Sequence, residues 1–268
     1  MSRPLIIDTF PFHDELDILE MRLTELYDAV DYFVLVEATK SHTDQDKPLW
    51  YQEHKDRFAA FADKIVPIVA DQLPSLDENP DPWARELAQR EHIGYGLAQI
   101  NPDANDIILQ SDVDEIPRAL HARNVRPKTG MVAFAQRGHF WAVDWLHPDP
   151  WHGTVAVTAG TLLRMMPGKF GNMRAMRNRS TVLPDAGWHF SWLGGPDRAR
   201  KKMANFCHPE VSDRIATALE SEHFYWREGF HCDGKQMRPV EVDESWPRWI
   251  VEGNAPESWF RPRVGVAA

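Results

Sequence analysis

The sequence predicts a single α/β domain in which a mostly parallel, Rossmann-like central sheet is flanked by helices. Two observations carry this prediction. In the first half of the chain, short apolar runs alternate with segments in which leucine recurs every three or four residues. The short runs are apolar throughout, as is typical of parallel strands covered on both faces. With 268 residues, 43% of them hydrophobic, the chain is long enough to bury a full core.

The elements of the first half follow one another in strand and helix order. The helix after the first strand is marked by leucines from Leu16 to Leu26, and a Pro- and Asp-rich loop at 71–82 precedes a helix from Trp83. In chain order we expect a strand at 4–10, this leucine-marked helix, a strand at 31–38, a helix near 54–64, a strand at 64–70, the helix from Trp83, and a strand at 106–112.

The pattern loosens after Pro117, where tryptophan and histidine become frequent. One or two of the tryptophans are expected to offer a flat apolar face to a ligand, and the others to fill the core. We expect strands within 131–146, 154–166 and 187–193, and helices at 197–206 and 211–229.

Charge and composition exclude several classes of protein. The 30 basic and 40 acidic residues give a net charge of −10, which provides no general attraction to nucleic acid or to an anionic membrane. Asp8 and Pro11 interrupt any signal-peptide core, and no apolar run is long enough to span a bilayer, so a cytoplasmic location is predicted. Cys207 and Cys232 are expected to be free thiols, because a chain of this size does not need a crosslink.

The segment "IILQSDVDEIPRA" at 107–119 places three carboxylates directly after a buried strand. Ligands of parallel sheets bind beyond the carboxyl ends of the strands, where Asp112, Asp114 and Glu115 are expected to lie. An Asp-x-Asp sequence supplies the hard oxygen ligands that Mg²⁺ or Mn²⁺ accepts. Alternatively, the same carboxylates could cap a helix that starts at Pro117.

Five segments, in order over about residues 5 to 210, resemble glycosyltransferase family 17. They are "DTFPFHDELDILEMRLTELYDAVDYFVLVEATKSHT", "FADKIVPIV", "WARELAQREHIGYGL", "DIILQSDVDEIPR" and "AGWHFSWLGG". The resemblance implies a GT-A fold, a sugar nucleotide donor and inversion at the anomeric carbon. Our first interpretation is a glycosyltransferase that uses UDP-N-acetylglucosamine or a related UDP-sugar to extend a glycan acceptor. Residues 1–117 would then form the donor half, and 118–268 the acceptor-side half of the same domain. His13, Asp14 and Asp144 depart from the residues usual in the family.

The resemblance assigns the metal ion to Asp112 and Asp114. A third ligand is sought in the second half of the chain, where His189 of "AGWHFSW" is the candidate, because neutral imidazole suits Mn²⁺. The competing interpretation makes His189 a core histidine. For the catalytic base we select Asp144 of "FWAVDW", with Asp185 and Glu115 as alternatives, although Asp144 could instead cap a turn.

The remaining assignments concern the donor. Glu37, at the end of the second strand, would accept from the N3 proton of uracil, or else be a solvated carboxylate. The helix "WARELAQR" presents two polar stripes, which would face the donor unless Glu86 and Arg90 form a surface ion pair. The basic run at 198–202 would cover the phosphates or lie on a solvated helix face. The candidate donor-binding residues are Phe12, Glu37, Arg85, Gln89, Arg90, Asp112, Lys201 and Lys202.

Two other functions remain open. A metal-dependent nucleotidyltransferase would also use paired aspartates on an α/β sheet, but usually has a glycine-rich phosphate loop near the first strand, which "DTFPFHDEL" lacks. A sugar-binding module that has lost turnover would have little use for an intact Asp-x-Asp sequence.

Overall fold

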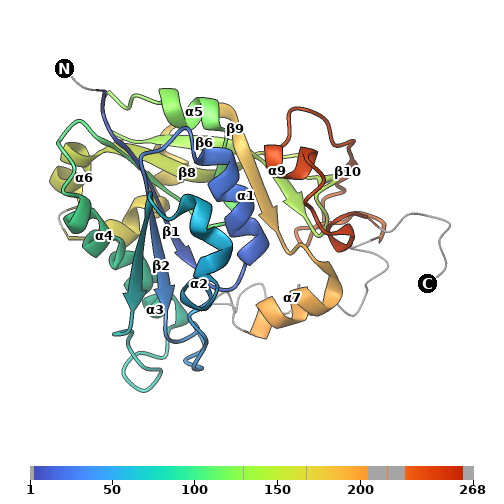
Figure 1. Cartoon of the computed structure of the whole chain (residues 1–268). Helices are drawn as coiled ribbons and strands as arrows, with labels where there is room; N and C mark the ends of the chain where they lie inside the picture. The colour runs from blue at the N-terminus through green and yellow to red at the C-terminus, as the bar shows by residue number, and fades with distance from the viewer. Residues whose placement is uncertain (1–2, 129, 167, 205–215, 217–226, 262–268) are drawn as a thin grey trace.

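The computed structural model describes residues 3–128, 130–166, 168–204, 216 and 227–261. Its centre is one mixed sheet (Figure 1). Cys207 and most of the helix expected at 211–229 lie outside the described residues, so the state of the thiols stays a prediction.

The first half of the chain builds the parallel part of the sheet. β1 (Ile6–Phe12) lies between β2 (Tyr32–Ala38) and β4 (Ile107–Gln110), and β3 (Ile65–Ala70) extends the sheet beyond β2. All three pairings are parallel. The predicted α/β class and the four strands of this half are confirmed.

The second half extends the sheet beyond β4 with antiparallel neighbours. β9 runs parallel to β6 and carries the short β5. The sheet is therefore mixed, parallel in one half and largely antiparallel in the other. The strands added here are β8 (Trp151–Thr158), β6 (Val132–Phe140), β7 (Trp145–Leu146), β10 (Arg238–Pro239), β9 (Thr181–Ser191) and β5 (Glu115–Pro117).

Two expected strands are shorter than predicted. The strand expected at 154–166 ends at Thr158, whose hydroxyl accepts from the Thr161 amide at 3.3 Å and caps helix α6 (Ala159–Met165). The strand expected at 131–146 divides into β6 and β7, because Trp141 between them has a left-handed backbone (φ 69°). Local capping and backbone conformation therefore overrode the apolar pattern.

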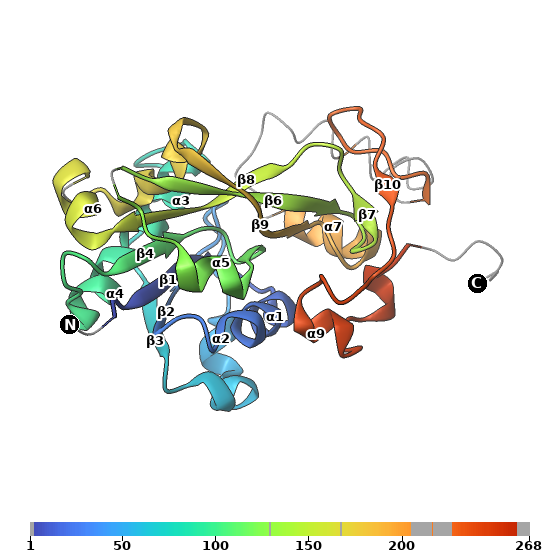
Figure 2. The ribbon, with the colours of Figure 1, turned by 90° about the horizontal axis from the view of Figure 1, so that it is seen from above.

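Successive side chains of the parallel strands pack into two separate cores. Ile6 packs in the core beneath α1 (Leu16–Leu26) and α9 (Arg248–Val251), and its neighbour Ile7 packs in the core beneath α4 (Ile93–Ile100). Figure 2 shows α1 and α9 on the same side of the sheet. Both faces are covered, as the continuous apolar strands predicted.

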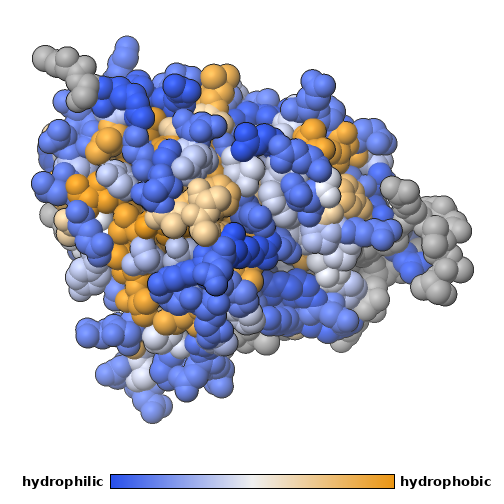
Figure 3. Space-filling view, viewed as in Figure 1, coloured by the Kyte–Doolittle hydropathy of each residue, from blue (hydrophilic) through white to orange (hydrophobic). Residues whose placement is uncertain are grey.

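One face of the molecule is largely hydrophilic. Figure 3 shows polar residues over most of the face seen in Figure 1, with smaller apolar areas between them. Tyr95, Leu120 and Leu163 are the most exposed of the large apolar side chains described, and they lie on three different helices. Among the described residues, no helix combines the length and apolar character needed to cross a membrane.

A buried ion pair joins the first strand, the first helix and the carboxylate loop. Arg22 of α1 and Asp8 of β1 have no exposed side-chain surface and form two hydrogen bonds, at 2.6 and 2.8 Å. The same guanidinium donates to the backbone carbonyls of Asp112 and Glu115 at 3.0 Å each, and to the Ser111 hydroxyl at 2.6 Å. Arg22 therefore fixes the backbone of the loop that carries the acidic side chains.

Arg22→Met should lower the free energy of unfolding by about 3–5 kcal/mol, because it leaves Asp8 charged and unpaired in the core. Urea denaturation measures this difference. The matched control is Arg3→Met, which removes an exposed pair with Asp31 and should cost less than about 1 kcal/mol. If both variants lose the same small free energy of unfolding, the pair of Asp8 and Arg22 does not stabilise the fold as proposed.

Candidate active site

A cavity of about 150 Å³ opens at the carboxyl ends of β1, β2 and β4, where a parallel sheet binds its ligands. Helix α3 (Pro82–Glu91), helix α7 (Gly195–Ala204) and the 3₁₀ helix Phe170–Arg179 contribute further walls. The structure brings together at this cavity the predicted residues Phe12, Gln89, Arg90, Asp112, Asp114, Lys201 and Lys202. The cavity is also lined by Glu15, His42 and Arg174, which the sequence interpretation did not include, and by Arg198, which it included only within the basic run at 198–202.

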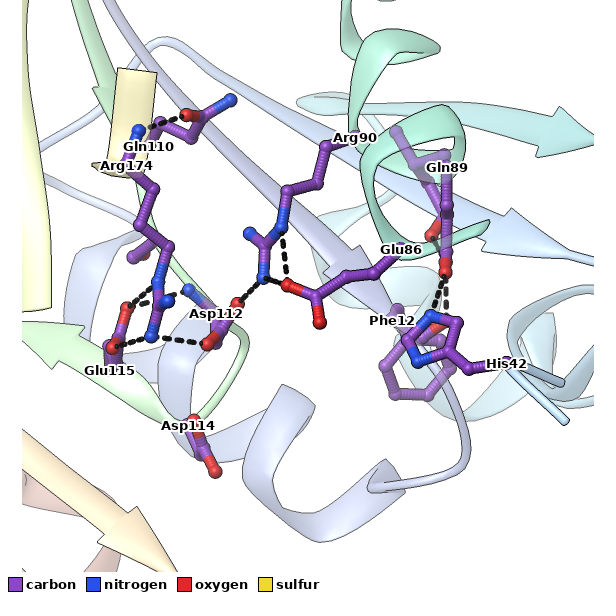
Figure 4. Close-up of polar contacts among 12 residues, drawn as sticks. Phe12, His42, Glu86, Gln89, Arg90, Gln110, Asp112, Asp114, Glu115 and Arg174 are labelled. Carbon is purple, nitrogen blue, oxygen red and sulfur yellow. Dashed lines mark hydrogen bonds and ion pairs between the residues drawn. The ribbon is translucent and has the colours of Figure 1, made fainter. Parts of the chain in front are cut away.

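Asp112 is held between two arginines (Figure 4). Arg174 approaches its Oδ2 atom at 2.6 Å, and Arg90 pairs with Oδ1 while also pairing with Glu86. Burial alone would raise the pKa of Asp112, but the two guanidinium groups outweigh it and hold the pKa well below the usual range. The Glu86–Arg90 pair is therefore buried and part of the cavity, not a surface ion pair.

Glu115 supports the loop from beneath. Its buried carboxylate accepts from Trp151 Nε1 at 2.6 Å, from Arg174 at 2.5 Å, and from the backbone amide of Asp112 at 2.8 Å. Glu115 does not line the cavity, so a catalytic role for it is not supported. Its hydrogen bonds orient the loop. The helix-capping alternative is wrong, because α5 (Ala119–Asn124) begins after Arg118 without a side-chain cap.

Asp114 lies directly before β5, and His189 lies on β9, the strand that pairs with β5. His189 Nε2 lies 3.7 Å from Asp114 Oδ1, and Lys202 Nζ lies 3.3 Å from the other carboxylate oxygen. The His189 ring stacks on Trp151, and its buried Nδ1 makes no hydrogen bond to the described residues. Burial raises the pKa of Asp114 and lowers that of His189, so the imidazole is neutral near pH 7.

A carboxylate beside a neutral imidazole is a donor pair that suits Mn²⁺, and Nε2 is the nitrogen of His189 that faces Asp114. Asp112 does not converge on the same point as Asp114 and His189 within the described part of the chain, because Arg90 and Arg174 engage its carboxylate. The residues therefore fit an ion held mainly by Asp114 and His189, with Asp112 adjacent.

The loop after β1 contributes acids that the sequence interpretation did not use. Asp14 pairs with Arg198 and, at 3.0 Å, with Lys201, both from α7. Glu15 lies next to it at the start of α1, where its Oε2 accepts from the Asp14 amide at 3.1 Å. Burial lowers the pKa of His13 to about 4, so this histidine is neutral near pH 7.

A second cavity of about 360 Å³ adjoins the first. Phe190, Trp192 and Trp259 supply aromatic surface on its far side. Trp192, Gly194 and Gly195 have positive φ, which turns the chain sharply from β9 into α7 and brings the basic run back over the loops. The residues that line both cavities are Asp14, Glu15, Asp114, Arg198 and Lys202.

Two predicted donor residues face elsewhere. The buried Glu37 carboxylate accepts from the backbone amides of Tyr51 and Gln52, at 2.7 and 3.2 Å, at the start of the short helix α2 (Trp50–Glu53). Arg85 is fully buried and pairs with Asp44 at 3.2 Å. Neither lines the cavity, so the assignment of Glu37 to a nucleotide base is corrected to a helix-start role.

Asp144 is also not where a base would be needed. Its carboxylate accepts from the backbone amide and from Nε of Arg261, at 2.9 and 2.7 Å. Asp185, the alternative, pairs with Arg118 and Arg137 and is largely exposed. Neither aspartate is among the described residues of the two cavities, and the structure therefore does not support either as the base.

Comparison with known proteins places these residues in a family. The family model for glycosyltransferase family 17 matches residues 1–238. The β-1,4-mannosyl-glycoprotein 4-β-N-acetylglucosaminyltransferases of Rattus norvegicus and Homo sapiens are each 25% identical over 234 residues, covering 75% of this chain. The match covers 42% of the rat protein and 43% of the human protein, so the chain spans less than half the length of these relatives.

Solved structures show weaker likenesses. A 4-diphosphocytidyl-2C-methyl-D-erythritol synthase has 12% identity and a TM-score of 0.42, with 69% of this chain and 90% of that chain covered. The apo-form glycosyltransferase GlyE of Streptococcus pneumoniae TIGR4 has 10% identity and a TM-score of 0.32, with 68% and 45% covered. Likenesses at this level do not bear on function.

Arg174→Gln should lower the free energy of unfolding at neutral pH by about 3 kcal/mol, because the buried Glu115 loses its paired cation and Asp112 loses one of its two arginines. The depressed pKa values of Asp112 and Glu115 contribute stability above their unfolded values of about 4, and this stability is lost as pH falls through the folded values. Without Arg174 those folded pKa values rise, so the deficit of the variant should shrink below about pH 4.

Denaturation series at several pH values measure this deficit. Arg179→Gln, an exposed change on the same 3₁₀ helix, should stay within about 0.5 kcal/mol of the parent at every pH. A deficit for Arg174→Gln that does not vary with pH would contradict the charge-based explanation.

Proposed function

The chain belongs to glycosyltransferase family 17, and from this premise we propose that it transfers N-acetylglucosamine from UDP-N-acetylglucosamine to a hydroxyl group of a glycan. The observation that carries the proposal is the pair of cavities that share a wall of acids and cations. A two-substrate transfer needs such a junction, with the donor on one side and the acceptor on the other. The activity named for the rat and human relatives supports the choice of sugar and of a β-linkage. A β-linked product from an α-linked UDP-sugar requires inversion.

The first cavity is assigned to the donor. Arg90, Arg174, Arg198, Lys201 and Lys202 line it, and cations at these positions neutralise a diphosphate. A divalent Mn²⁺ or Mg²⁺ held by Asp114 and His189, with Asp112 beside it, would stabilise the negative charge that grows on the leaving diphosphate. Arg90 and Arg174 fix Asp112 for either the ion or the ribose.

The nucleoside is assigned to the opposite end of the same cavity. Phe12 contributes to the wall there, and His42 Nε2 lies 3.1 Å from Gln89 Oε1 (Figure 4). Gln89 Nε2 donates to the backbone carbonyl of Val36 at 2.9 Å, which fixes the amide orientation. With Glu37 engaged by its own helix, His42 and Gln89 take over the recognition of a uracil edge in this proposal.

The second cavity is assigned to the acceptor. Trp192 and Trp259 give the flat apolar surface on which a sugar ring stacks. Among the acids on the shared wall, Asp14 and Asp114 are each paired with cations, whereas Glu15 makes no ion pair with the described residues. Glu15 is therefore proposed as the base that takes the proton from the acceptor hydroxyl while the bond from the anomeric carbon to the diphosphate breaks.

Hydrolysis of sugar nucleotides without acceptor, measured with Mn²⁺ across a panel of donors, tests the reaction class. Slow release of UDP from UDP-N-acetylglucosamine is the expected result. Pyrophosphate release from a nucleoside triphosphate and a sugar phosphate would instead indicate a nucleotidyltransferase. Binding of UDP-sugars without hydrolysis and without transfer to any glycan would indicate a sugar-binding module.

Asp114→Asn should remove the gain in UDP affinity that Mn²⁺ provides, because the ion loses its main carboxylate. Calorimetry with and without Mn²⁺ should show a gain of about tenfold or more, equivalent to about 1.4 kcal/mol, in the parent and little in the variant. Asp185→Asn, at an aspartate outside both cavities, should behave as the parent. A parent chain that binds UDP equally with and without Mn²⁺ would remove the metal from the proposal.

Glu15→Gln should lower the transfer rate by about two to four orders of magnitude and leave UDP affinity unchanged, since only proton removal is lost. Asp144→Asn, which weakens a pairing with Arg261 outside the cavities, should keep a rate near that of the parent. Steady-state transfer rates and UDP calorimetry on both variants give the comparison. The reverse result, a slow Asp144→Asn and a normal Glu15→Gln, would return the role to Asp144.

A further inference from the structure

Two turns meet at the sheet edge formed by β7 and β10. This edge lies beyond β6, away from the parallel strands β1, β2 and β4. Trp145 and Leu146 of β7 pair antiparallel with Pro239 and Arg238 of β10, and Figure 2 shows the two strands side by side. His147 follows β7 directly. The segment 229–237 leads into β10, so the strand pairing brings it against His147.

The segment 229–237 is a closed hairpin with a fixed shape. Phe230 and Gln236 form an antiparallel bridge, and the Met237 amide donates to the Gly229 carbonyl at 2.7 Å. At its tip, the amide of Gly234 donates to the carbonyl of His231 at 2.9 Å, and the left-handed backbone of Gly234 (φ +87°) closes the turn. His231 and Asp233, on the first arm and tip of this turn, are therefore held in place by backbone hydrogen bonds.

Three ligand atoms converge between the two turns. Asp233 Oδ2 lies 3.3 Å from His147 Nε2, and Asp233 Oδ1 lies 2.9 Å from His231 Nδ1. All three groups offer an atom within 4.8 Å of the others, which no other set of three histidine, cysteine or carboxylate side chains does within the described ranges. The side chains of His147 and His231 are only 9% and 16% exposed, and that of Asp233 is 34% exposed. The cluster is thus buried on the protein side and open to solvent on one side.

The protonation states suit a cation. Burial lowers the pKa of His231, so its imidazole is neutral near pH 7, and zinc would replace the proton that Nδ1 shares with Asp233. Burial raises the pKa of Asp233, but hydrogen bonds from the Lys235 amide and from His231 outweigh it and bring the pKa to about 2. Lys235 Nζ lies 3.6 Å from Asp233 and also pairs with Asp149; at 49% exposure it can turn to solvent at little cost.

We propose that His147, His231 and Asp233 form a binding site for one zinc ion. Two imidazoles and one carboxylate are the donor types that zinc takes, and a nitrogen-rich set favours zinc over Mn²⁺ or Mg²⁺ in affinity. Cys232 is not a ligand in this arrangement, because its Sγ lies 3.6 Å from His231 Nε2, the nitrogen that does not face Asp233. The fourth position is left to water.

The ion would join the turn after β7 to the hairpin before β10. Phe140 lies beneath both imidazoles, with ring centroids 5.6 Å from His147 and 4.3 Å from His231, and its ring also contacts His189 at 5.3 Å. Zinc bound to His147, His231 and Asp233 would therefore hold Phe140, and through it His189, more rigidly without lining the first cavity.

Zinc binding to the full chain tests the site. The protein is stripped with a chelator, and zinc is titrated against a chromophoric competitor in the absence of nucleotide. We expect one zinc ion per chain. Loss of a residue that only supports a metal ligand lowers metal affinity by about 10- to 100-fold, and His147→Asn and His231→Asn should each lower the zinc affinity by more than that. The control variants are His152→Asn, a histidine of β8 outside the cluster, and Asp114→Asn, which alters the other candidate ion site; both should keep the parent affinity.

Two further measurements test the site. Saturating zinc should raise the melting temperature of the parent chain, and this shift should be absent in His147→Asn. Cobalt in place of zinc should give visible absorption bands without a thiolate charge-transfer band. The site is overturned if the parent binds no zinc, if His147→Asn and His231→Asn bind it as the parent does, or if Asp114→Asn alone abolishes binding. A thiolate band would overturn the ligand set.

Discussion

The buried pair of Asp8 and Arg22 is the interaction on which the candidate site depends. A charged pair with no exposed surface is stable only if its remaining hydrogen-bonding groups are satisfied, and here backbone carbonyls of the loop after β4 satisfy them. The loop therefore has little freedom. Its carbonyls turn inward to the guanidinium, and the side chains of Asp112 and Asp114 are left to face the cavity. Desolvation of the two charges costs free energy, and in return the pair holds three neighbouring carboxylates in one place.

Charge compensation then determines the rest of the cavity. Three carboxylates within four residues repel one another, and burial would protonate some of them if cations were absent. Arg174 lies between Asp112 and Glu115 and pairs with both, and Lys202 faces Asp114, so each of the three acids has a cation nearby. These cations come from the second half of the chain. The second half therefore completes the charge balance of the first, and a bound diphosphate would enter a site where cations are already gathered.

The sequence predicted what depends on local pattern. Continuous apolar runs identified the parallel strands, and the position of the acids after β4 identified the edge of the sheet where the cavity lies. The failures involve partners that are distant along the chain: Asp144 meets Arg261, and Arg174 sits on a 3₁₀ helix that has no amphipathic period. Glu37 was placed correctly at a strand end, but the amides of the following helix use its carboxylate. Arg22 could have been found, because it lies one turn from the apolar Leu19 and Leu26 on the buried face of its helix.

One helix sets the geometry between the two halves of the proposed reaction. α1 begins directly after Glu15 and carries Arg22 two turns later. Because Arg22 is bonded to the loop that holds Asp114, the distance from Glu15 to that loop is fixed through the helix and not by either loop alone. β1 and β4 are neighbours in the sheet, so the loops that follow them are adjacent. A shift of α1 would then move the proposed base and the loop proposed to hold the metal together, which preserves their relative position. The second cavity, lined partly by Trp259, is free to differ in shape.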